Sequence, residues 1–142
     1  MANEVKVIDA TGLVLGRASS HIAKRLLQGE HLAVINADSA VVLGDRDTVI
    51  HSYADARARG SVRKGPYYPR TPERIFRRTV RGMLPFKRST GREAFQRLQA
   101  YNGVPTDLKG KPAETIEGAR ATPSLREPIT LLELSRLLGV KS

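Results

Sequence analysis

Short apolar runs and one amphipathic stretch alternate along the first part of the chain. Residues 5–9 are rich in β-branched side chains, and residues 32–35 and 40–43 are continuous apolar runs as long as a buried strand. Between the first two runs, residues 17–28 carry apolar side chains four positions apart, which predicts a helix that Gly29 closes. Continuous apolar strands joined through helices are typical of a parallel sheet that is covered on both faces. The pattern therefore predicts an α/β fold.

The next part of the chain is predicted to consist mainly of helices and loops. Asp45 is expected to cap a helix of about 12 residues. Residues 60–69 form a loop that contains glycine, proline and tyrosine. Thr71 and Pro72 suit the cap and the first turn of a further helix, which Pro85 stops.

Two pairs of residues have the spacing of a capping box, in which a Thr and a Glu three positions later satisfy backbone amides at the start of a helix. The pairs are Thr90 with Glu93 and Thr130 with Glu133. The first predicts a helix that ends at about residue 100, and the second predicts a C-terminal helix over about 130–139. A short strand is expected near residues 114–116. A length of 142 residues suits one domain, 1–142, with one core.

Charge changes this picture, because the positive charge is concentrated in one segment. The chain carries 24 Lys and Arg against 14 Asp and Glu, a net charge of +10. Residues 57–97 hold 13 of these basic residues and two acids, a net charge of +11, so the rest of the chain is almost neutral. Of the 24 basic residues 17 are Arg, whose planar guanidinium suits phosphate. The segment predicts a polyanionic partner, and nucleic acid is the commonest one.

The helix that begins after Thr71 places four of these arginines together. On a helical wheel they fall within an arc of about 100°, and the apolar side chains between them fall broadly opposite. The four are Arg74, Arg77, Arg78 and Arg81. Like charges at this spacing repel one another, so a sequence accepts them more readily when an external anion cancels the charge. RNA phosphates would do so; the alternatives are an acidic protein surface, a membrane surface and a merely solvated face.

A nucleotide-binding α/β enzyme is an alternative from another class. Gly12 and Gly16 lie between a predicted strand and a predicted helix, where phosphate loops occur, and Asp38 follows the next strand, where a ribose-binding acid would lie. The spacing matches neither a dinucleotide nor a triphosphate loop, and a tight turn explains both glycines. The chain has no Cys and its three His lack metal-ligand spacing. We therefore expect no catalytic residue, no metal and no cofactor.

Two further expectations concern partner and location. A DNA-binding module remains an alternative, because charge alone does not separate DNA from RNA. No apolar run is long enough to cross a membrane, the first residues lack the apolar stretch of a signal peptide, and Cys is absent. We therefore expect a cytoplasmic protein.

Several motifs of the chain stand in the order of a known family. Residues 7–17 spell Val-Ile-Asp-Ala-x-Gly-x-x-Leu-Gly-Arg, residues 65–68 spell Gly-Pro-Tyr-Tyr, and residues 74–85 spell Arg-Ile-Phe-Arg-Arg-Thr-Val-Arg-Gly-Met-Leu-Pro. With these motifs the chain resembles the family of large-subunit ribosomal protein thirteen, in its archaeal type. The resemblance is close over residues 5–105 and weaker beyond them.

The resemblance implies a three-layer α/β/α fold around a small parallel sheet, with a basic helical extension. It also implies a non-catalytic, structural constituent of the large ribosomal subunit. Such a protein binds large-subunit ribosomal RNA, contacts neighbouring ribosomal proteins, joins the particle early in assembly, and has no membrane or small-molecule partner. With few aromatic residues to stack on bases, we expect it to bind through RNA shape and backbone.

The resemblance also suggests which residues face the RNA, all within or near the basic segment except one. The first group lies on the basic helix and just after it: Arg74, Arg77, Arg78, Arg81, Lys87, Arg88 and Arg92. A second strip precedes that helix: Arg63, Lys64, Tyr67 and Tyr68. Arg17 is a separate candidate, at the start of the first helix.

Overall fold

Helices and short strands alternate along the chain in a computed structural model, which describes residues 5–43, 46–58, 71–121 and 128–138. The strands are β1 (Val5–Asp9), β2 (His31–Ile35), β3 (Val41–Val42), β4 (Leu98–Ala100), β5 (Ala113–Glu114) and β6 (Ile129–Thr130). The α-helices are α1 (Leu15–Leu27), α2 (Arg46–Ala58), α3 (Pro72–Gly82), α4 (Ser89–Gln96) and α5 (Leu131–Leu137). Three single turns of 3-10 helix are η1 (Ala37–Ser39), η2 (Thr106–Leu108) and η3 (Glu117–Ala119).

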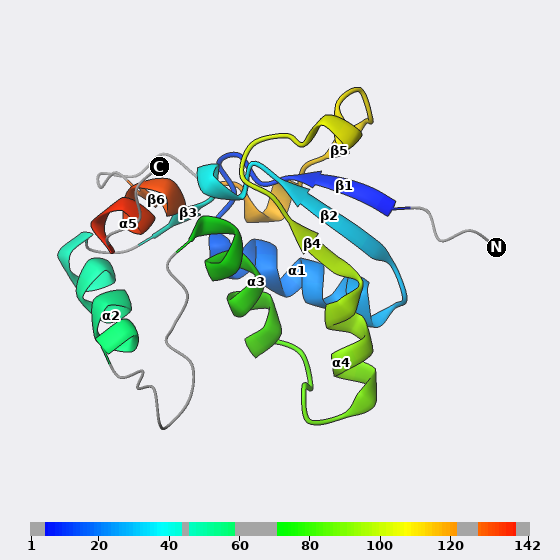
Figure 1. Cartoon of the computed structure of the whole chain (residues 1–142), viewed down its shortest axis with the longest axis horizontal. Coiled ribbons are helices and arrows are strands. Elements are labelled where there is room, and N and C mark those ends of the chain that lie inside the picture. Colours follow the sequence, from blue (N-terminus) through cyan, green and yellow to red (C-terminus); the bar gives the residue numbers. More distant parts are fainter. Residues whose placement is uncertain (1–4, 44–45, 59–70, 122–127, 139–142) are drawn as a thin grey trace.

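Four parallel strands form the central sheet, in the order β4-β2-β1-β5 (Figure 1). β1 and β2 pair along their whole length, beginning with Val5 opposite His31. Val7 and Ile8 are neighbours in β1 and so point to opposite faces of the sheet, yet they are only 3% and 0% exposed. The sheet is thus covered on both faces, which is the reason that its central strands need continuous apolar runs. The predicted α/β class with a mainly parallel sheet is confirmed.

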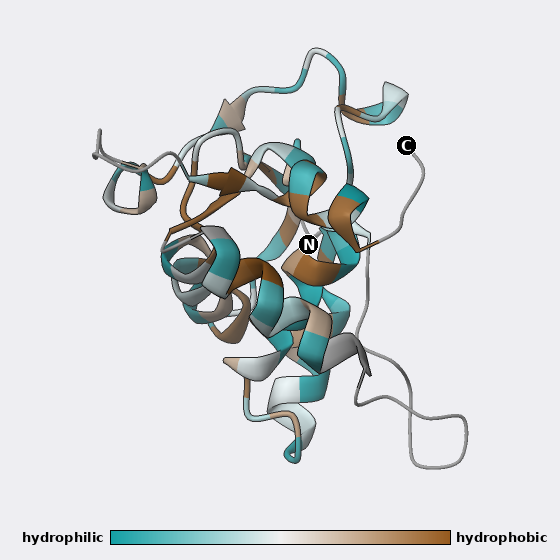
Figure 2. Cartoon of the chain, turned by 90° about the vertical axis from the view of Figure 1, so that its left-hand side faces the viewer, coloured by the Kyte–Doolittle hydropathy of each residue, from teal (hydrophilic) through white to brown (hydrophobic). Residues whose placement is uncertain are grey.

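The core lies between the sheet and the helices α1, α3 and α4, which lie together beside it (Figure 1). Ile22 and Leu26 of α1, Phe76 of α3 and Leu98 of β4 are buried in the same cluster. Figure 2 shows helical ribbons with both hydrophobic and hydrophilic stretches, as amphipathic helices have. The basic helix α3 is therefore anchored in the core by one side.

Two predicted elements differ from the structure. The apolar run at 40–43 contributes only the short strand β3, which pairs antiparallel with β6 outside the central sheet, and Leu43 is exposed. The helix predicted to end near residue 100 stops at Gln96, and residues 98–100 form the edge strand β4 instead. Leu32 of β2 pairs there with Leu98. A non-local strand pairing thus overrides a local helical pattern.

The predicted helix caps have mixed outcomes. Thr130 caps α5 as predicted, because its hydroxyl accepts a hydrogen bond from the Glu133 amide at 3.2 Å. Thr90 caps nothing: α4 begins one residue before it, and its cap residue is Arg88, with no side-chain bond. The cap predicted at Asp45 lies outside the described residues.

An ion-pair network ties the end of α1 to the sheet. Arg25 donates to Glu30 from Nε at 2.9 Å and from Nη2 at 3.0 Å, and its Nη1 lies 3.1 Å from a carboxylate oxygen of Glu114 in β5. Lys6 of β1 also lies 3.2 Å from Glu30. The Arg25 hydrogen bond, aided by Lys6, outweighs burial and lowers the pKa of Glu30 to about 2. The Glu30 carboxylate is therefore held ionised by the fold.

Candidate nucleic-acid interface

The buried side of α3 fixes the direction of its charged side. The helix begins at Pro72, whose ring suits the first helical position, after Thr71 in an extended conformation. Ile75, Phe76 and Val80 are each 0% exposed. Since these three side chains are in the core, the arginines between them can only point towards the outer surface or towards neighbouring elements.

The four arginines of α3 do not all lie free on that surface. Arg74 and Arg78 are exposed, as the helical wheel predicts. Arg77 and Arg81 are only half-exposed, because each is covered on one side by a phenylalanine. The predicted stripe therefore consists of two exposed arginines and two arginines that phenylalanines partly cover.

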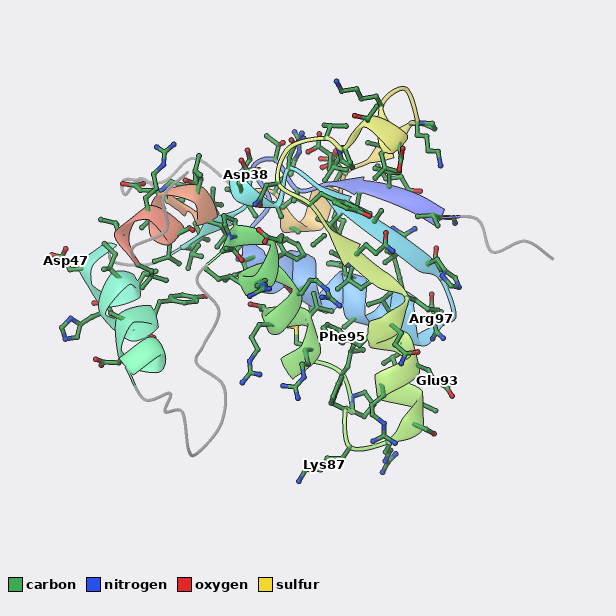
Figure 3. The ribbon with its side chains drawn as sticks, in the orientation of Figure 1. Asp38, Asp47, Lys87, Glu93, Phe95 and Arg97 are labelled. Carbon is green, nitrogen blue, oxygen red and sulfur yellow. The ribbon has the colours of Figure 1, made fainter. Side chains whose placement is uncertain are left out.

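Two phenylalanines that follow α3 in the chain stack against Arg77 and Arg81. The Arg77 guanidinium carbon lies 4.5 Å from the centre of the Phe95 ring, and that of Arg81 lies 4.2 Å from the centre of the Phe86 ring. The two rings pack edge to face, 5.6 Å apart and at 77°. We refer to Arg77, Arg81, Phe86 and Phe95 as the Arg–Phe cluster. Figure 3 shows Phe95 directed from α4 towards α3.

The loop between α3 and α4, residues 83–88, is short and closely held. The Phe86 amide donates to Leu84 O at 2.8 Å and the Arg88 amide donates to Pro85 O at 2.9 Å. Gly91 of α4 lies so close to Pro85 that a Cβ atom there would overlap the Pro85 carbonyl group. The loop is thus folded back onto the first turn of α4.

The same loop displays two of the predicted RNA-facing residues. Lys87 and Arg88 are exposed, and Figure 3 shows Lys87 at the outer end of the loop, pointing away from the helices. In the described ranges of the chain, no ion pair involves Arg74, Lys87 or Arg88. Glu73, an acid of this region, accepts a hydrogen bond from Asn102 at 2.6 Å. The positive charge of the three cations is therefore available to an external anion.

Two other arginines of the basic segment stabilise the protein itself. Arg92, a predicted RNA-facing residue, is exposed, and its Nη1 donates to the carbonyls of Phe86 and Lys87 at 3.3 and 3.2 Å. Arg97 is half-buried, and its Nη2 donates to Leu26 O at 2.7 Å, at the end of α1. The sequence shows that Arg92 and Arg97 are charged, but it does not predict these contacts. The contacts depend on the loop geometry and on the packing of α1.

Backbone amides in the turn before α1 donate hydrogen bonds to backbone carbonyls of the protein itself. The Gly12 amide donates to Ser39 O at 3.1 Å and the Val14 amide donates to Ala119 O at 2.7 Å. Asp38, the candidate ribose-binding acid, accepts a hydrogen bond from the Gly103 amide at 3.2 Å. Arg17 is exposed in the first turn of α1. The amides of Gly12 and Val14 that a phosphate loop would offer are thus used to join the β1–α1 turn to neighbouring segments.

Polar side chains at the carboxyl ends of β1 and β2 also satisfy one another. Asp9 accepts hydrogen bonds from the amide and the hydroxyl of Thr11 and from Asn36. Burial raises the pKa of Asp9, but these hydrogen bonds outweigh it, so the pKa is lowered overall. Asn36 adopts the left-handed conformation, with φ of 55°. These hydrogen bonds engage polar groups at the edge of the sheet where α/β enzymes bind ligands.

The remaining expectations concern a second strip of candidate residues, metal ligands and membrane-spanning helices. Arg63, Lys64, Tyr67 and Tyr68, the second predicted strip, lie outside the described residues. Among the described residues, no three His, Cys, Asp or Glu side chains gather as metal ligands. Over the same ranges, no helix has the length and apolar character needed to cross a membrane.

Comparison with known proteins finds one matching family and similar proteins from several organisms. The family described as ribosomal protein L13 matches residues 3–107. A protein of Archaeoglobus fulgidus called large ribosomal subunit protein uL13 is 50% identical over 143 aligned positions, covering 99% of this chain and 92% of the relative. Proteins of the same name from Methanosarcina barkeri and Thermoplasma acidophilum are 48% and 43% identical, each covering 95% of this chain and 98% of the relative.

Proposed function

Because the chain belongs to the ribosomal protein L13 family, we propose that it binds large-subunit ribosomal RNA through α3 and the α3–α4 loop. Its structural, non-enzymatic role in the large ribosomal subunit follows from the family. The finer proposal concerns which partner it touches and with which residues. The alternative, a nucleotide-binding α/β enzyme, loses its support, because the β1–α1 turn and Asp38 form hydrogen bonds within the protein.

One observation carries the proposal: exposed cations stand on the outer side of a helix whose other side is buried. Arg74 and Arg78 belong to α3, and Lys87 and Arg88 belong to the loop after it. The fully buried Ile75 and its neighbours prevent α3 from turning these charges inward. Over the described residues no ion pair involves Arg74, Lys87 or Arg88, and a fixed array of such cations suits a track of phosphates more than it suits one compact anion.

The mode of binding we propose is recognition of RNA shape and backbone. The central sheet is covered on both faces, so it offers no open platform on which bases could stack. Phe86 and Phe95 are occupied by arginines and by each other. The proposed RNA-facing residues are Arg74, Arg77, Arg78, Arg81, Lys87, Arg88 and Arg92, with Arg63, Lys64, Tyr67 and Tyr68 as a second strip and Arg17 as a separate candidate.

The proposal extends to the setting of the protein. It joins the large subunit early in assembly, lies against neighbouring ribosomal proteins and is found in the cytoplasm as part of the ribosome. A protein that binds RNA through backbone charge and a rigid surface can associate before its protein neighbours arrive. Its order of entry is measurable by mass spectrometry of pulse-labelled subunit precursors.

The first test is the dependence of RNA affinity on salt. The probe is a transcript of the large-subunit ribosomal RNA of Archaeoglobus fulgidus. If 6–10 phosphates are contacted, affinity should fall by about 10³–10⁵ between 50 and 200 mM salt on the duplex DNA scale, and by somewhat less on RNA. An affinity that hardly changes over this range, or that is matched by duplex DNA of equal length, would contradict the proposal.

The second test compares two sites by substitution. Replacing both Arg74 and Arg78 by Gln preserves helix propensity and relieves repulsion along α3, so the fold should hold. RNA affinity should fall, and the salt slope should shrink by up to about two units. Arg17→Gln should do far less, because one charge stands alone there. If Arg17→Gln weakens binding more than the folded double variant does, α3 is not the main site.

A further inference from the structure

The Arg–Phe cluster joins α3 to both sides of the loop that follows it. Phe86 belongs to the α3–α4 loop itself, so its stack with Arg81 joins α3 to the loop. Phe95 belongs to α4, so its stack with Arg77 joins α3 to the next helix. The edge-to-face contact of the two rings then closes the connection between loop and α4.

From this geometry we infer, on the basis of the proposed RNA-binding function, that Arg77 and Arg81 are positioning residues rather than phosphate ligands. By stacking on Phe95 and Phe86 they fix the α3–α4 loop against α3. The exposed cations of the loop, Lys87 and Arg88, then stand in a set arrangement with those of α3. The RNA meets one preformed surface instead of a helix and a separate loop.

The surroundings of Arg77 support this role. Its side chain is half-buried, and its Nε is covered and has no hydrogen-bond acceptor in the described part of the chain. A guanidinium with a ring against one face and a covered Nε has fewer donors left for a phosphate than an exposed one. Arg74, one helical turn before Arg77, is exposed instead.

The loop needs such a fixation, because its other restraints are local. Its backbone hydrogen bonds run between residues two or three apart, and Arg92 holds it from α4 only. Met83 and Leu84 donate to Val80 O and Arg81 O of α3 at 2.9 and 3.1 Å, and Leu84 is buried, but past Leu84 no backbone hydrogen bond among the described residues joins the loop to α3. A loop that must be ordered during binding lowers affinity, whereas a loop that is ordered beforehand does not. The stacks therefore contribute to RNA affinity without any contact to RNA.

The phenylalanines allow a test that leaves every charge in place. Phe86→Leu and Phe95→Leu keep an apolar side chain but remove the ring. On the RNA transcript of Archaeoglobus fulgidus, each should weaken binding by about 3- to 10-fold, with an unchanged salt slope, because the same phosphates are contacted after the loop has been ordered. Phe86→Tyr keeps the ring and should restore affinity.

The arginines provide the complementary measurement. If Arg81 acts through Phe86, then Arg81→Gln should weaken binding about as much as Phe86→Leu does, and the double variant should be little worse than either. If Arg81 instead binds a phosphate, Arg81→Gln should lower the salt slope by about one unit whether or not Phe86 is present. That second result would overturn the inference for Arg81, and the same comparison applies to Arg77 with Phe95.

Hydrogen exchange of the free protein tests the positioning role without RNA. The amides of residues 86–92 should exchange faster in Phe86→Leu and in Arg81→Gln, because the loop opens more often. Arg74→Gln is the matched control: it removes a charge from the same helix outside the cluster, so exchange at 86–92 should stay as in the unsubstituted protein. Equal exchange in all variants would contradict the inference.

The outcomes separate this inference from the proposed function. If the unsubstituted protein does not bind the transcript, the proposed function fails. If it binds, and Phe86→Leu and Phe95→Leu bind equally well, only the positioning role fails. Circular dichroism establishes first that each variant is folded. Where a leucine variant is not folded, the salt slopes of Arg77→Gln and Arg81→Gln decide between positioning and direct contact.

Discussion

Replacing Gly91 by alanine should destabilise the protein, although the residue lies inside a helix. An alanine is normally favoured over glycine in a helix by about 1 kcal/mol. Here an added Cβ would overlap the carbonyl group of Pro85 and would lie 3.0 Å from the Phe86 nitrogen. These neighbours are backbone atoms, so no side-chain rotation can relieve the overlap. Either the α3–α4 loop or the first turn of α4 has to move.

The size of the effect follows from what such a movement would break. Overpacking that shifts backbone typically costs about 1–3 kcal/mol. The shift would also strain the Arg88–Pro85 backbone bond and the bonds from Arg92, each worth about 1 kcal/mol. After the gain in helix propensity, we expect Gly91→Ala to lower the free energy of unfolding by about 2–4 kcal/mol. For a chain of this length that is a fall in Tm of roughly 6–12 °C.

Gly82→Ala is the matched control for this prediction. Gly82 is the last residue of α3, and a Cβ there would meet nothing within 4 Å. Gly82→Ala should therefore leave the free energy of unfolding unchanged or raise it by up to about 1 kcal/mol. Urea unfolding of both variants, followed by circular dichroism, gives the comparison. If Gly91→Ala is as stable as Gly82→Ala, the close approach of α4 to Pro85 does not exist in solution.

Three further predictions concern stability. The pKa of Glu30 is lowered from 4.5 to about 2, so its contribution to stability is complete above pH 4.5 and is lost as the pH falls towards 2; the Tm of Glu30→Gln should accordingly fall less steeply over this window than that of the unsubstituted protein. Thr130→Ala should lower the free energy of unfolding by about 1 kcal/mol in urea, whereas Thr90→Ala should not, because only Thr130 accepts a capping bond. Phe76→Ala should cost about 3–5 kcal/mol by the same measurement, since Phe76 is fully buried; a loss below 1 kcal/mol would show that the core is misplaced.

Elements with a complete local pattern could be predicted from the sequence. β1, β2, α1 and α3 were predictable because their apolar periodicity and closing residues agree with their tertiary environment, although Thr71, the predicted cap of α3, makes no side-chain capping bond. β4 was not predictable, because residues 98–100 follow a helical pattern and become a strand only by pairing with β2. The run at 40–43 has a strand-like composition, but nothing local indicates that it pairs with β6, almost 90 residues later.

The candidate site, like the fold, could be predicted only in part from the sequence. A helical wheel reports positions relative to the helix axis, so it correctly predicts that Ile75 and Val80 are buried and that the arginines point away from them. It contains no information about what stands beside the helix. That Arg77 meets Phe95 depends on the return of the chain through the loop and on the angle of α4. One hint in the sequence is an aromatic residue within the basic loop and another in the helix that follows it.

Two kinds of partner, carboxylates and aromatic rings, hold Arg25, Arg77 and Arg81, and the two differ in their effect on the local charge. Arg25 is paired with the carboxylates of Glu30 and Glu114, which cancel its charge where it serves to tie α1 to the sheet. Arg77 and Arg81 are held by rings instead. A ring attracts a guanidinium through its quadrupole and carries no net charge, so the stack fixes the side chain while the positive field of α3 remains intact. Acidic partners at the same places would fix the loop equally well but would weaken the attraction for phosphate. The aromatic rings thus fix these side chains and leave the positive charge that the proposed RNA-binding surface needs.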